Sequence, residues 1–469
     1  MGQYSKLGKN VALITLGNFA SKILSFFLIP LYTAVLTTAE YGTADLMTTT
    51  INLLSPFFTL LISEAVMRYA LDDGKDKKQV FTIGMVITFI GFLVMMLFSP
   101  LVLLSKDIKP YFWYFIFYYL FVTLHSGISQ FVKGIEKVTV YSLSGVIQTI
   151  CFILLNIVLL LVVKTGVIGY LLSLIISNAV ACAFLWFGAK LSKYIIKPNK
   201  IDKALLKEML KYSVPMIPNS LSWWISNSSD KYLLTFFSGV AVTGVYSVSQ
   251  RIPSMFSTIS TIFMGAWQIS AVEDFGSEKS KRFYSNIYNQ YSVFNVLIVS
   301  ILICICKILA KFLFAKDFFV GWKYVPVLLF AFLFSAMASF LGTIYTSAKK
   351  TKMLFVSTIA AAIINIILNI IFIPIWDAQG AAIATFVSYF VVWLMRLIDT
   401  RKIMKLKINI KQDIVSYLLI TGQIVVILID FKYSLIIALL IFVAIIAVNF
   451  KSLKPLAKMA AGMIKYKVR

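Results

Sequence analysis

Seven ionisable residues interrupt long apolar segments of this 469-residue chain, and they are its candidates for chemistry in an apolar environment. They are Lys22, Asp45, Glu64, Arg68, Asp230, Lys231 and Arg251. A charged side chain in hydrocarbon costs several kcal/mol, so such groups usually face a bundle interior or a wet cavity. We therefore expect the segments that carry these charges to line one polar cavity. The three carboxylates are candidates for binding a coupling ion.

Some of these charges also have simple structural interpretations. Glu64 and Arg68 are four residues apart, in the order that favours a helical ion pair, so we expect them to pair with each other. Asp230 and Lys231 are adjacent and point about 100° apart on a helix, so they cannot pair with each other. Lys231 lies near one end of its segment and could extend its ammonium group to the membrane surface.

Other polar and aromatic residues in the same segments suit a wet cavity. Lys22 lies about 18 Å into its segment by helical rise, too deep to reach the surface easily. Arg251 lies similarly deep in another segment. Trp223, Trp224 and Asn227 stand among several serines, a composition that suits contact with sugars. Small polar residues also serve helix packing in membranes, so both interpretations stay open here.

Fourteen apolar segments position these residues. Their approximate bounds are 10–36, 43–70, 80–104, 111–132, 140–163, 167–189, 213–237, 242–272, 284–306, 324–347, 353–373, 380–395, 414–430 and 433–450. About 20 apolar residues span a bilayer. About three quarters of the 44 Lys and Arg residues fall at the two termini and in every second connection, as expected for cytoplasmic segments. The pattern predicts an all-α integral membrane protein with both termini in the cytoplasm.

Several function classes are disfavoured. The formal net charge of +25 would suit nucleic acid, but its concentration on one membrane side favours contact with anionic lipids instead. The sequence has no phosphate-binding loop of the G-x-x-x-x-G-K-[ST] type. Its four cysteines and single histidine lie in apolar segments without acidic neighbours, so we expect no metal and no cofactor. Short external connections argue against a glycosyltransferase or polymerase.

The chain divides into two related halves. Asn156 and Gly169 in the first half correspond to Asn369 and Gly380 in the second half. The predicted parts are an N-lobe of six helices at 1–190, a cytoplasmic amphipathic linker at 191–212, a six-helix C-lobe at 213–400, and two further helices with a basic tail at 401–469. We expect the linker to place its apolar face on the inner leaflet.

Three stretches resemble a known family. They are NFASKILSFFLIPLYTAVLTTAEYGTADL at 18–46, PMIPNSLSWWISNSSDKYLLTFFSG at 215–239 and INIILNIIFIPIWDAQGAAIATFVSY at 364–389. Together they resemble the bacterial polysaccharide biosynthesis family of Wzx-type flippases. That family belongs to the superfamily of multidrug, oligosaccharidyl-lipid and polysaccharide exporters. The resemblance implies a MATE-like fold with two six-helix lobes around a central cavity.

The resemblance also implies a function. The chain would be a transporter of the bacterial cytoplasmic membrane, and not an enzyme. It would move a polyprenyl-pyrophosphate-linked oligosaccharide outward by alternating access, using Lys22, Arg68, Lys231 and Arg251 as cavity cations. Expected partners are this substrate, membrane lipids and the polymerase and glycosyltransferases of the pathway, with no nucleic acid. An ion-coupled multidrug antiporter using the three carboxylates is the alternative, and a membrane glycosyltransferase is a distant one.

Overall fold

The computed structural model describes residues 26–273, 278–348, 350 and 352–467, and this part of the chain is helical without strands. The chain forms two compact units. The first unit comprises Met1–Thr235 and Gly239–Gly244. The second unit comprises Phe236–Ser238 and Val245–Arg469.

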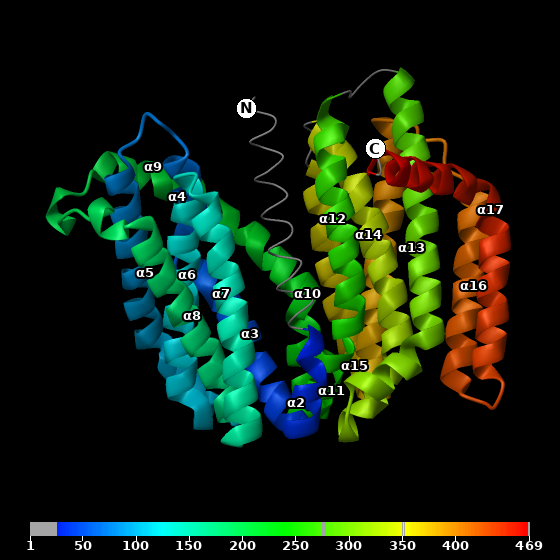
Figure 1. Cartoon of the computed structure of the whole chain (residues 1–469), viewed down its shortest axis with the longest axis horizontal. Helices are drawn as coiled ribbons and strands as arrows, with labels where there is room; N and C mark the ends of the chain where they lie inside the picture. Colours follow the sequence, from blue (N-terminus) through cyan, green and yellow to red (C-terminus); the bar gives the residue numbers. More distant parts are fainter. Residues whose placement is uncertain (1–25, 274–277, 349, 351, 468–469) are drawn as a thin grey trace. The chain divides into compact units, whose positions relative to one another are not determined.

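The first unit contains the described helices up to Thr235 of α10, together with the start of α11 (Figure 1). Its α-helices are α2 (Ile29–Val35), α3 (Thr38–Phe58), α4 (Ile62–Ala70), α5 (Lys77–Phe98), α6 (Phe112–Gly134), α7 (Val138–Asn156), α8 (Val167–Ala189), α9 (Lys203–Ser213), α10 (Ile217–Ser238) and the start of α11 (Val240–Ser249). Short turns of tighter or wider helix join them: η1 (Ser99–Leu104), η2 (Lys109–Tyr111), η3 (Ile157–Val162), η4 (Leu191–Tyr194), η5 (Pro198–Lys200) and η6 (Val214–Met216).

A break divides the predicted second membrane segment into α3 and α4. Thr37 caps α3 by accepting from the Glu40 N–H, while Glu40 accepts from the Thr37 N–H at 2.8 Å. After α3, Leu60 and Leu61 adopt φ of 53° and 49°, a left-handed conformation that interrupts the helix. The two helices therefore meet at a bend of 64°. Span 43–70 is thus not the continuous helix that the apolar run suggested.

The linker helix α9 packs on protein. Its apolar residues Leu205 and Met209 are buried in a core formed with residues such as Val66, Phe81 and Leu185. Lys75 also forms an ion pair of 2.7 Å with Glu208 of α9. A helix lies within the predicted linker, but the apolar face expected to lie on the inner leaflet packs mainly against α4 and α5 (Figure 1). Burial of its large side chains in protein replaces contact with lipid.

Two glycines let α3 and α11 cross at backbone contact. A Cβ added at Gly42 would lie 2.2 Å from the Val240 carbonyl oxygen. A Cβ added at Gly244 would lie 1.9 Å from the Thr38 carbonyl oxygen. Distances this short exclude a side chain at either position, so this crossing requires both glycines.

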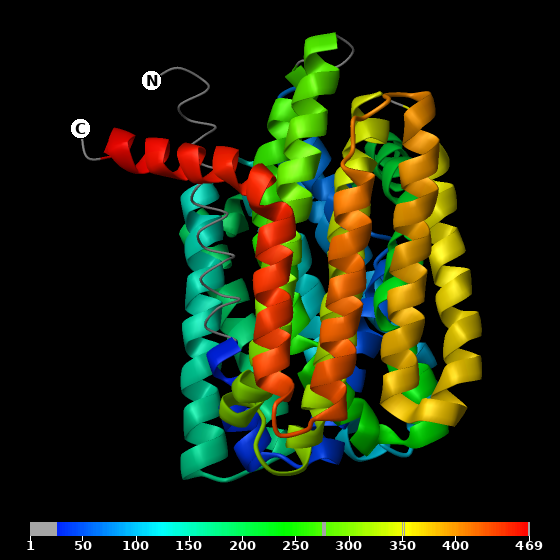
Figure 2. The ribbon, with the colours of Figure 1, turned by 90° about the vertical axis from the view of Figure 1, so that its right-hand side faces the viewer.

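The second unit contains the end of α11 and the later helices. They are α12 (Arg251–Glu273), α13 (Glu278–Leu313), η7 (Lys316–Lys323), α14 (Val325–Ser347), α15 (Lys352–Asp399), η8 (Thr400–Lys402), α16 (Ile410–Ile429) and α17 (Ser434–Lys467). Figure 2 shows α16 and α17 side by side, and α17 also contacts α13. Gln423 of α16 accepts from Ser300 of α13 at 2.8 Å, a buried polar contact that links the last helices to the unit.

One turn occurs at equivalent places in the two units. In α15, Asp377 has a φ of 49° and divides two predicted membrane segments, and a Cβ at Gly380 would lie 2.3 Å from the Phe372 carbonyl oxygen. Between α7 and α8, Lys164 has a φ of 59°, and a Cβ at Gly169 would lie 2.2 Å from the Thr165 hydroxyl. Both turns thus combine a residue of positive φ with a closely packed glycine, and at Gly380 the neighbouring atom is a backbone oxygen, so the packing there requires the glycine.

The helices are those of a multi-pass membrane protein. In the described part of the chain, eight helices are long and apolar enough to cross a membrane, or up to nine with α3 and α4 taken as one bent span. The fourteen predicted segments also include the first segment, which lies mostly outside the described residues. They further include α10, which is more polar, two segments within α15, and the apolar stretch Ser434–Phe450. The predicted segment 242–272 is not one helix, since it divides into α11 (Val240–Ser249) and α12 (Arg251–Glu273), and neither is among these spans.

Candidate functional site

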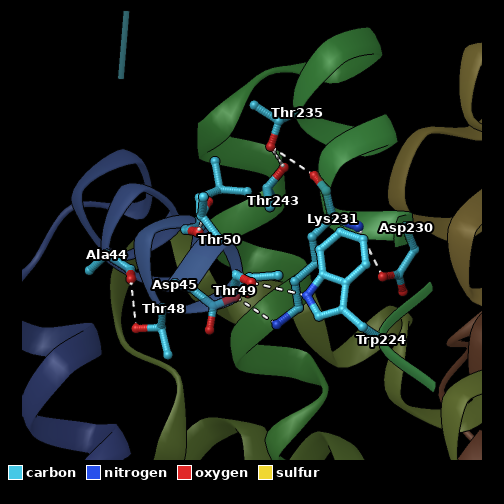
Figure 3. A network of polar contacts seen from close by, with 11 residues as sticks. Ala44, Asp45, Thr48, Thr49, Thr50, Trp224, Asp230, Lys231, Thr235 and Thr243 are labelled. Carbon is cyan, nitrogen blue, oxygen red and sulfur yellow. Dashed lines mark hydrogen bonds and ion pairs between the residues drawn. The ribbon is translucent and has the colours of Figure 1, made fainter. Parts of the chain in front are cut away.

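An ion pair between α10 and α3 is the centre of the candidate site (Figure 3). The Lys231 Nζ lies 2.6 Å from Asp45 Oδ2, and the two side chains are only 13% and 11% exposed. An ion pair this little exposed is weakly screened by water, so each charge depends strongly on its partner. Asp45 and Lys231 were separate candidates in the sequence, and the structure brings them together within the first unit.

Aromatic residues of α10 extend this contact along α3. The indole N–H of Trp224 donates to the Thr49 carbonyl oxygen at 3.0 Å. The Tyr232 hydroxyl hydrogen-bonds Thr50, and the rings of Trp224 and Tyr232 lie 5.4 Å apart. Lys231 and Tyr232 lie seven and eight residues after Trp224, which is about two helical turns, and all three side chains contact α3. Helix α10 therefore presents a charge and two aromatic rings to α3.

Hydrogen bonds fix the backbone around Lys231. The buried Asp230 accepts from the Lys231 N–H at 2.9 Å through Oδ1. Thr235 donates to the Lys231 carbonyl oxygen at 2.8 Å, and its hydroxyl lies 2.9 Å from that of Thr243 on α11 (Figure 3). The ammonium group of Lys231 is therefore carried by a well-supported turn of α10.

The arrangement can exchange one anionic partner for another. Asp45 neutralises Lys231 when no ligand is present, so the two groups can lie in an apolar region at moderate cost. A phosphate that approached Lys231 would compete with the carboxylate for the same ammonium group. The displaced carboxylate would then gain from a proton or a metal cation. The pair thus has the chemistry of an anion site with a built-in competing group.

The remaining predicted site residues lie elsewhere. Lys22 and the side chain of Trp223 are outside the described residues, so the structure does not place them in the site. Asn227 is on α10 and exposed to solvent. Arg251 begins α12 in the second unit, where its side chain is half-buried.

The expected ion pair between Glu64 and Arg68 is absent. Both residues lie on α4, and within the described part of the chain neither has an ion-pair partner. The Arg68 side chain is exposed, so it can remain hydrated instead. The bend before α4 also separates both residues from the straight helix that carries Asp45.

Sequence reasoning missed Tyr232, Thr49 and Thr50 as members of the cluster. Helical spacing could have indicated two of them, because Tyr232 lies eight residues after Trp224 and Thr49 lies one turn after Asp45. Thr49 contributes a main-chain carbonyl, which no residue type reveals.

Residues 7–268 match the family described as "Polysaccharide biosynthesis protein", which is more than half of the chain. No sequence among the curated proteins matches this chain.

Solved structures share the fold. A structure of the lipid II flippase MurJ in an inward closed conformation has a TM-score of 0.70 at 17% identity, over 95% of this chain and 100% of that chain. An inward-facing multidrug resistance transporter of the MATE family has a TM-score of 0.63 at 15% identity, over 83% of this chain and 94% of that chain. A MOP superfamily transporter from Pyrococcus furiosus has a TM-score of 0.57 at 13% identity, over 84% of this chain and 95% of that chain. The predicted MATE-like, all-α membrane fold is confirmed.

Proposed function

The chain belongs to the polysaccharide biosynthesis protein family, and from this premise we propose that it is a lipid-linked oligosaccharide flippase. It moves a polyprenyl-pyrophosphate-linked oligosaccharide from the inner to the outer leaflet of the bacterial cytoplasmic membrane, for cell-surface polysaccharide synthesis. The observation that supports this proposal is the Lys231–Asp45 pair, because it supplies a little-exposed cation for the diphosphate. No covalent bond changes, so the process is transport and not enzymatic catalysis.

Lys231 exchanges partners in the proposed cycle. The substrate diphosphate takes the Lys231 ammonium group from Asp45, and the released carboxylate binds a proton or a cation. When Asp45 loses that proton or cation, it recovers Lys231 and expels the diphosphate. Asp45 therefore limits the affinity for substrate, which a transporter needs in order to let its cargo go. Glu64 and Asp230 are the other proposed sites of ion coupling.

The other proposed elements follow the predicted organisation. Lys22, Arg68 and Arg251 are the further proposed cations of the transport path. We also propose that Trp224 contacts the sugars. Its ring is partly exposed, and its N–H donates to the Thr49 carbonyl oxygen of α3. The predicted lobes 1–190 and 213–400 would alternate in opening to the two sides of the membrane.

A flipping assay tests the role of Lys231. Purified full-length protein is reconstituted into liposomes with a short-chain, fluorescent polyprenyl-diphosphate oligosaccharide, and outward movement is measured by quenching from one side. We expect Lys231→Ala to lose at least tenfold in rate, because it removes the little-exposed ammonium group that pairs with Asp45 and that the diphosphate would bind. Lys231→Arg should retain part of the rate, since charge is kept.

Two further variants sharpen this assay. Asp45→Asn should lower the apparent KM for substrate and also slow turnover, because the group that competes with the diphosphate is lost. Lys307→Ala is the matched control, because it disrupts a Lys–Asp pair that is 41% and 38% exposed in the second unit. Full transport by Lys231→Ala at normal protein level would overturn the proposal.

A multidrug or cation antiporter is the second candidate. The favouring observation is that two carboxylates, Asp45 and Asp230, lie with a single lysine in the described cluster. An antiporter of this kind would extrude a cationic dye when a proton gradient is imposed, and Asp45→Asn would abolish the efflux. Dye efflux without oligosaccharide flipping would favour this candidate over the flippase.

A further inference from the structure

A basic pocket lies at one end of the second unit, and the proposed transport function does not use it. It has a volume of about 570 Å³, and its lining residues are Tyr345, Lys350, Lys352, Met353, Asp399, Lys402 and Ile403. The walls are the end of α14, the start of α15 and the turn η8 after α15. Helices α14 and α15 are long and apolar enough to cross a membrane, so a pocket at their ends belongs at the level of the lipid headgroups.

Main-chain and side-chain contacts shape the pocket. The Lys350 N–H donates to the Tyr345 carbonyl oxygen at 2.9 Å, which closes the end of α14 and fixes Lys350 beside Tyr345. The buried Tyr345 donates its hydroxyl proton to Asp399 Oδ2 at 3.0 Å. Lys402 pairs with the other oxygen of Asp399 at 3.0 Å. One lysine of the pocket is thus neutralised.

The other lysines of the pocket carry net positive charge. Within the described residues, Lys350 and Lys352 form no ion pair, and both are exposed. Asp399 is the single carboxylate of the lining, and it already contacts Lys402. The free pocket therefore has two positive charges in excess.

A buried arginine lies one helical turn before Asp399. Arg396 is 5% exposed and donates to the Ser357 hydroxyl at 2.9 Å, the Ala338 carbonyl oxygen at 3.0 Å and the Thr358 hydroxyl at 3.0 Å. All these acceptors are neutral, and in the described part of the chain Arg396 has no carboxylate partner. A buried charge without a counter-charge favours an anion nearby. Arg396 thus adds a fixed positive charge to this end of the unit.

We propose that this pocket binds the phosphate group of an anionic phospholipid. Lys350, Lys352 and Lys402 contact the phosphate oxygens, while Met353 and Ile403 contact the glycerol and the start of the acyl chains. Basic pockets between membrane helices are known to hold anionic headgroups. The position at the membrane surface and the apolar residues of the lining select a lipid over a free phosphate ion. This proposal does not depend on the transport function.

The test measures binding of single lipids to the purified full-length protein in detergent. Dioctanoyl phosphatidylglycerol is titrated against dioctanoyl phosphatidylcholine, which has the same phosphodiester but no net charge. We expect the anionic lipid to bind at least tenfold more tightly. A lysine near an anionic headgroup contributes about 1 kcal/mol, so Lys350→Ala with Lys352→Ala should weaken phosphatidylglycerol roughly 30-fold.

Matched variants separate the pocket from general surface charge. Lys316→Ala with Lys323→Ala removes two exposed lysines of η7, outside the pocket lining, and should leave the affinity unchanged. Asp399→Asn should strengthen phosphatidylglycerol binding several-fold. It removes a repelling charge but keeps an oxygen that accepts from Tyr345. A purely structural pocket would not gain affinity in this way.

Three results would overturn the proposal. The first is equal affinity for the charged and the zwitterionic lipid. The second is unchanged phosphatidylglycerol binding after loss of both lysines. The third is displacement of phosphatidylglycerol by millimolar inorganic phosphate, which would make the pocket a site for small anions. The lysine and Asp399 variants leave the Lys231–Asp45 pair intact, so failure of this proposal is distinguishable from failure of the flippase proposal.

Discussion

The Asp45–Lys231 pair should couple strongly in a double-mutant cycle. At 2.6 Å, the attraction between two unit charges is about 6 kcal/mol for an effective dielectric constant of 20. Desolvation of both groups offsets much of this energy. Removing one partner of a buried pair typically costs about 3–5 kcal/mol, because the other charge stays uncompensated. Because the two side chains are only 13% and 11% exposed, we expect each single variant to lower the free energy of unfolding by about 3 kcal/mol.

The variants keep the shape of the side chains. Asp45→Asn and Lys231→Met are each measured, together with the double variant, by reversible unfolding of the purified protein in mixed detergent micelles. The double variant should be destabilised by much less than the sum of the two, since it leaves neither charge alone. The expected coupling free energy is at least about 2 kcal/mol, within the range for residues in contact.

The Lys307–Asp430 pair provides the control cycle. Its side chains are 41% and 38% exposed, so water screens the attraction. Exposed pairs contribute about 0–1 kcal/mol, and the coupling between Lys307→Met and Asp430→Asn should fall in that range. Equal coupling in the two cycles would refute the reasoning, because it would show that the burial of Asp45 and Lys231 adds nothing.

Three other expectations can be checked independently. Gly244→Ala should destabilise the protein by about 1–3 kcal/mol, because its Cβ would collide with a carbonyl oxygen. Gly145→Ala is the control and should be neutral or stabilising in the same unfolding measurement, because no atom lies within 4 Å of its Cβ. Trp224→Phe should cost about 1 kcal/mol, because it removes the hydrogen bond from the indole N–H to the Thr49 carbonyl oxygen; no change in unfolding would contradict that bond. Reporter fusions at Asn199 should read cytoplasmic and those at Asp377 external, and one reversal would refute the predicted topology.

The sequence predicted the helices well because a bilayer imposes their length and polarity. The break at Leu60 and Leu61 was not predictable, because neither residue type favours a left-handed backbone. The docking of α9 on protein also escaped prediction. The sequence pattern of an amphipathic helix is the same whether its apolar face packs on lipid or on protein.

The candidate site was predictable only in part. Asp45 and Lys231 stood out because charges are rare in apolar segments, yet 186 positions separate them in the chain. Their pairing depends on which faces of two helices meet, and no local pattern encodes that. Arg396 directly follows the twelfth apolar segment, so the sequence does not distinguish it from the basic residues of the next connection. Its burial became evident only in the structure.

The polarity of α10 has a consequence for the synthesis of the protein. This helix is not among those apolar enough to cross a membrane by themselves, and it carries Asp230 and Lys231. Each such charge opposes insertion of an isolated helix by about 3 kcal/mol. During biogenesis α10 should therefore enter the bilayer efficiently only when α3 is already there to offer Asp45. The Lys231–Asp45 pair, which we assign to transport, would then also act during membrane insertion, because it would stabilise α10 in the bilayer beside α3.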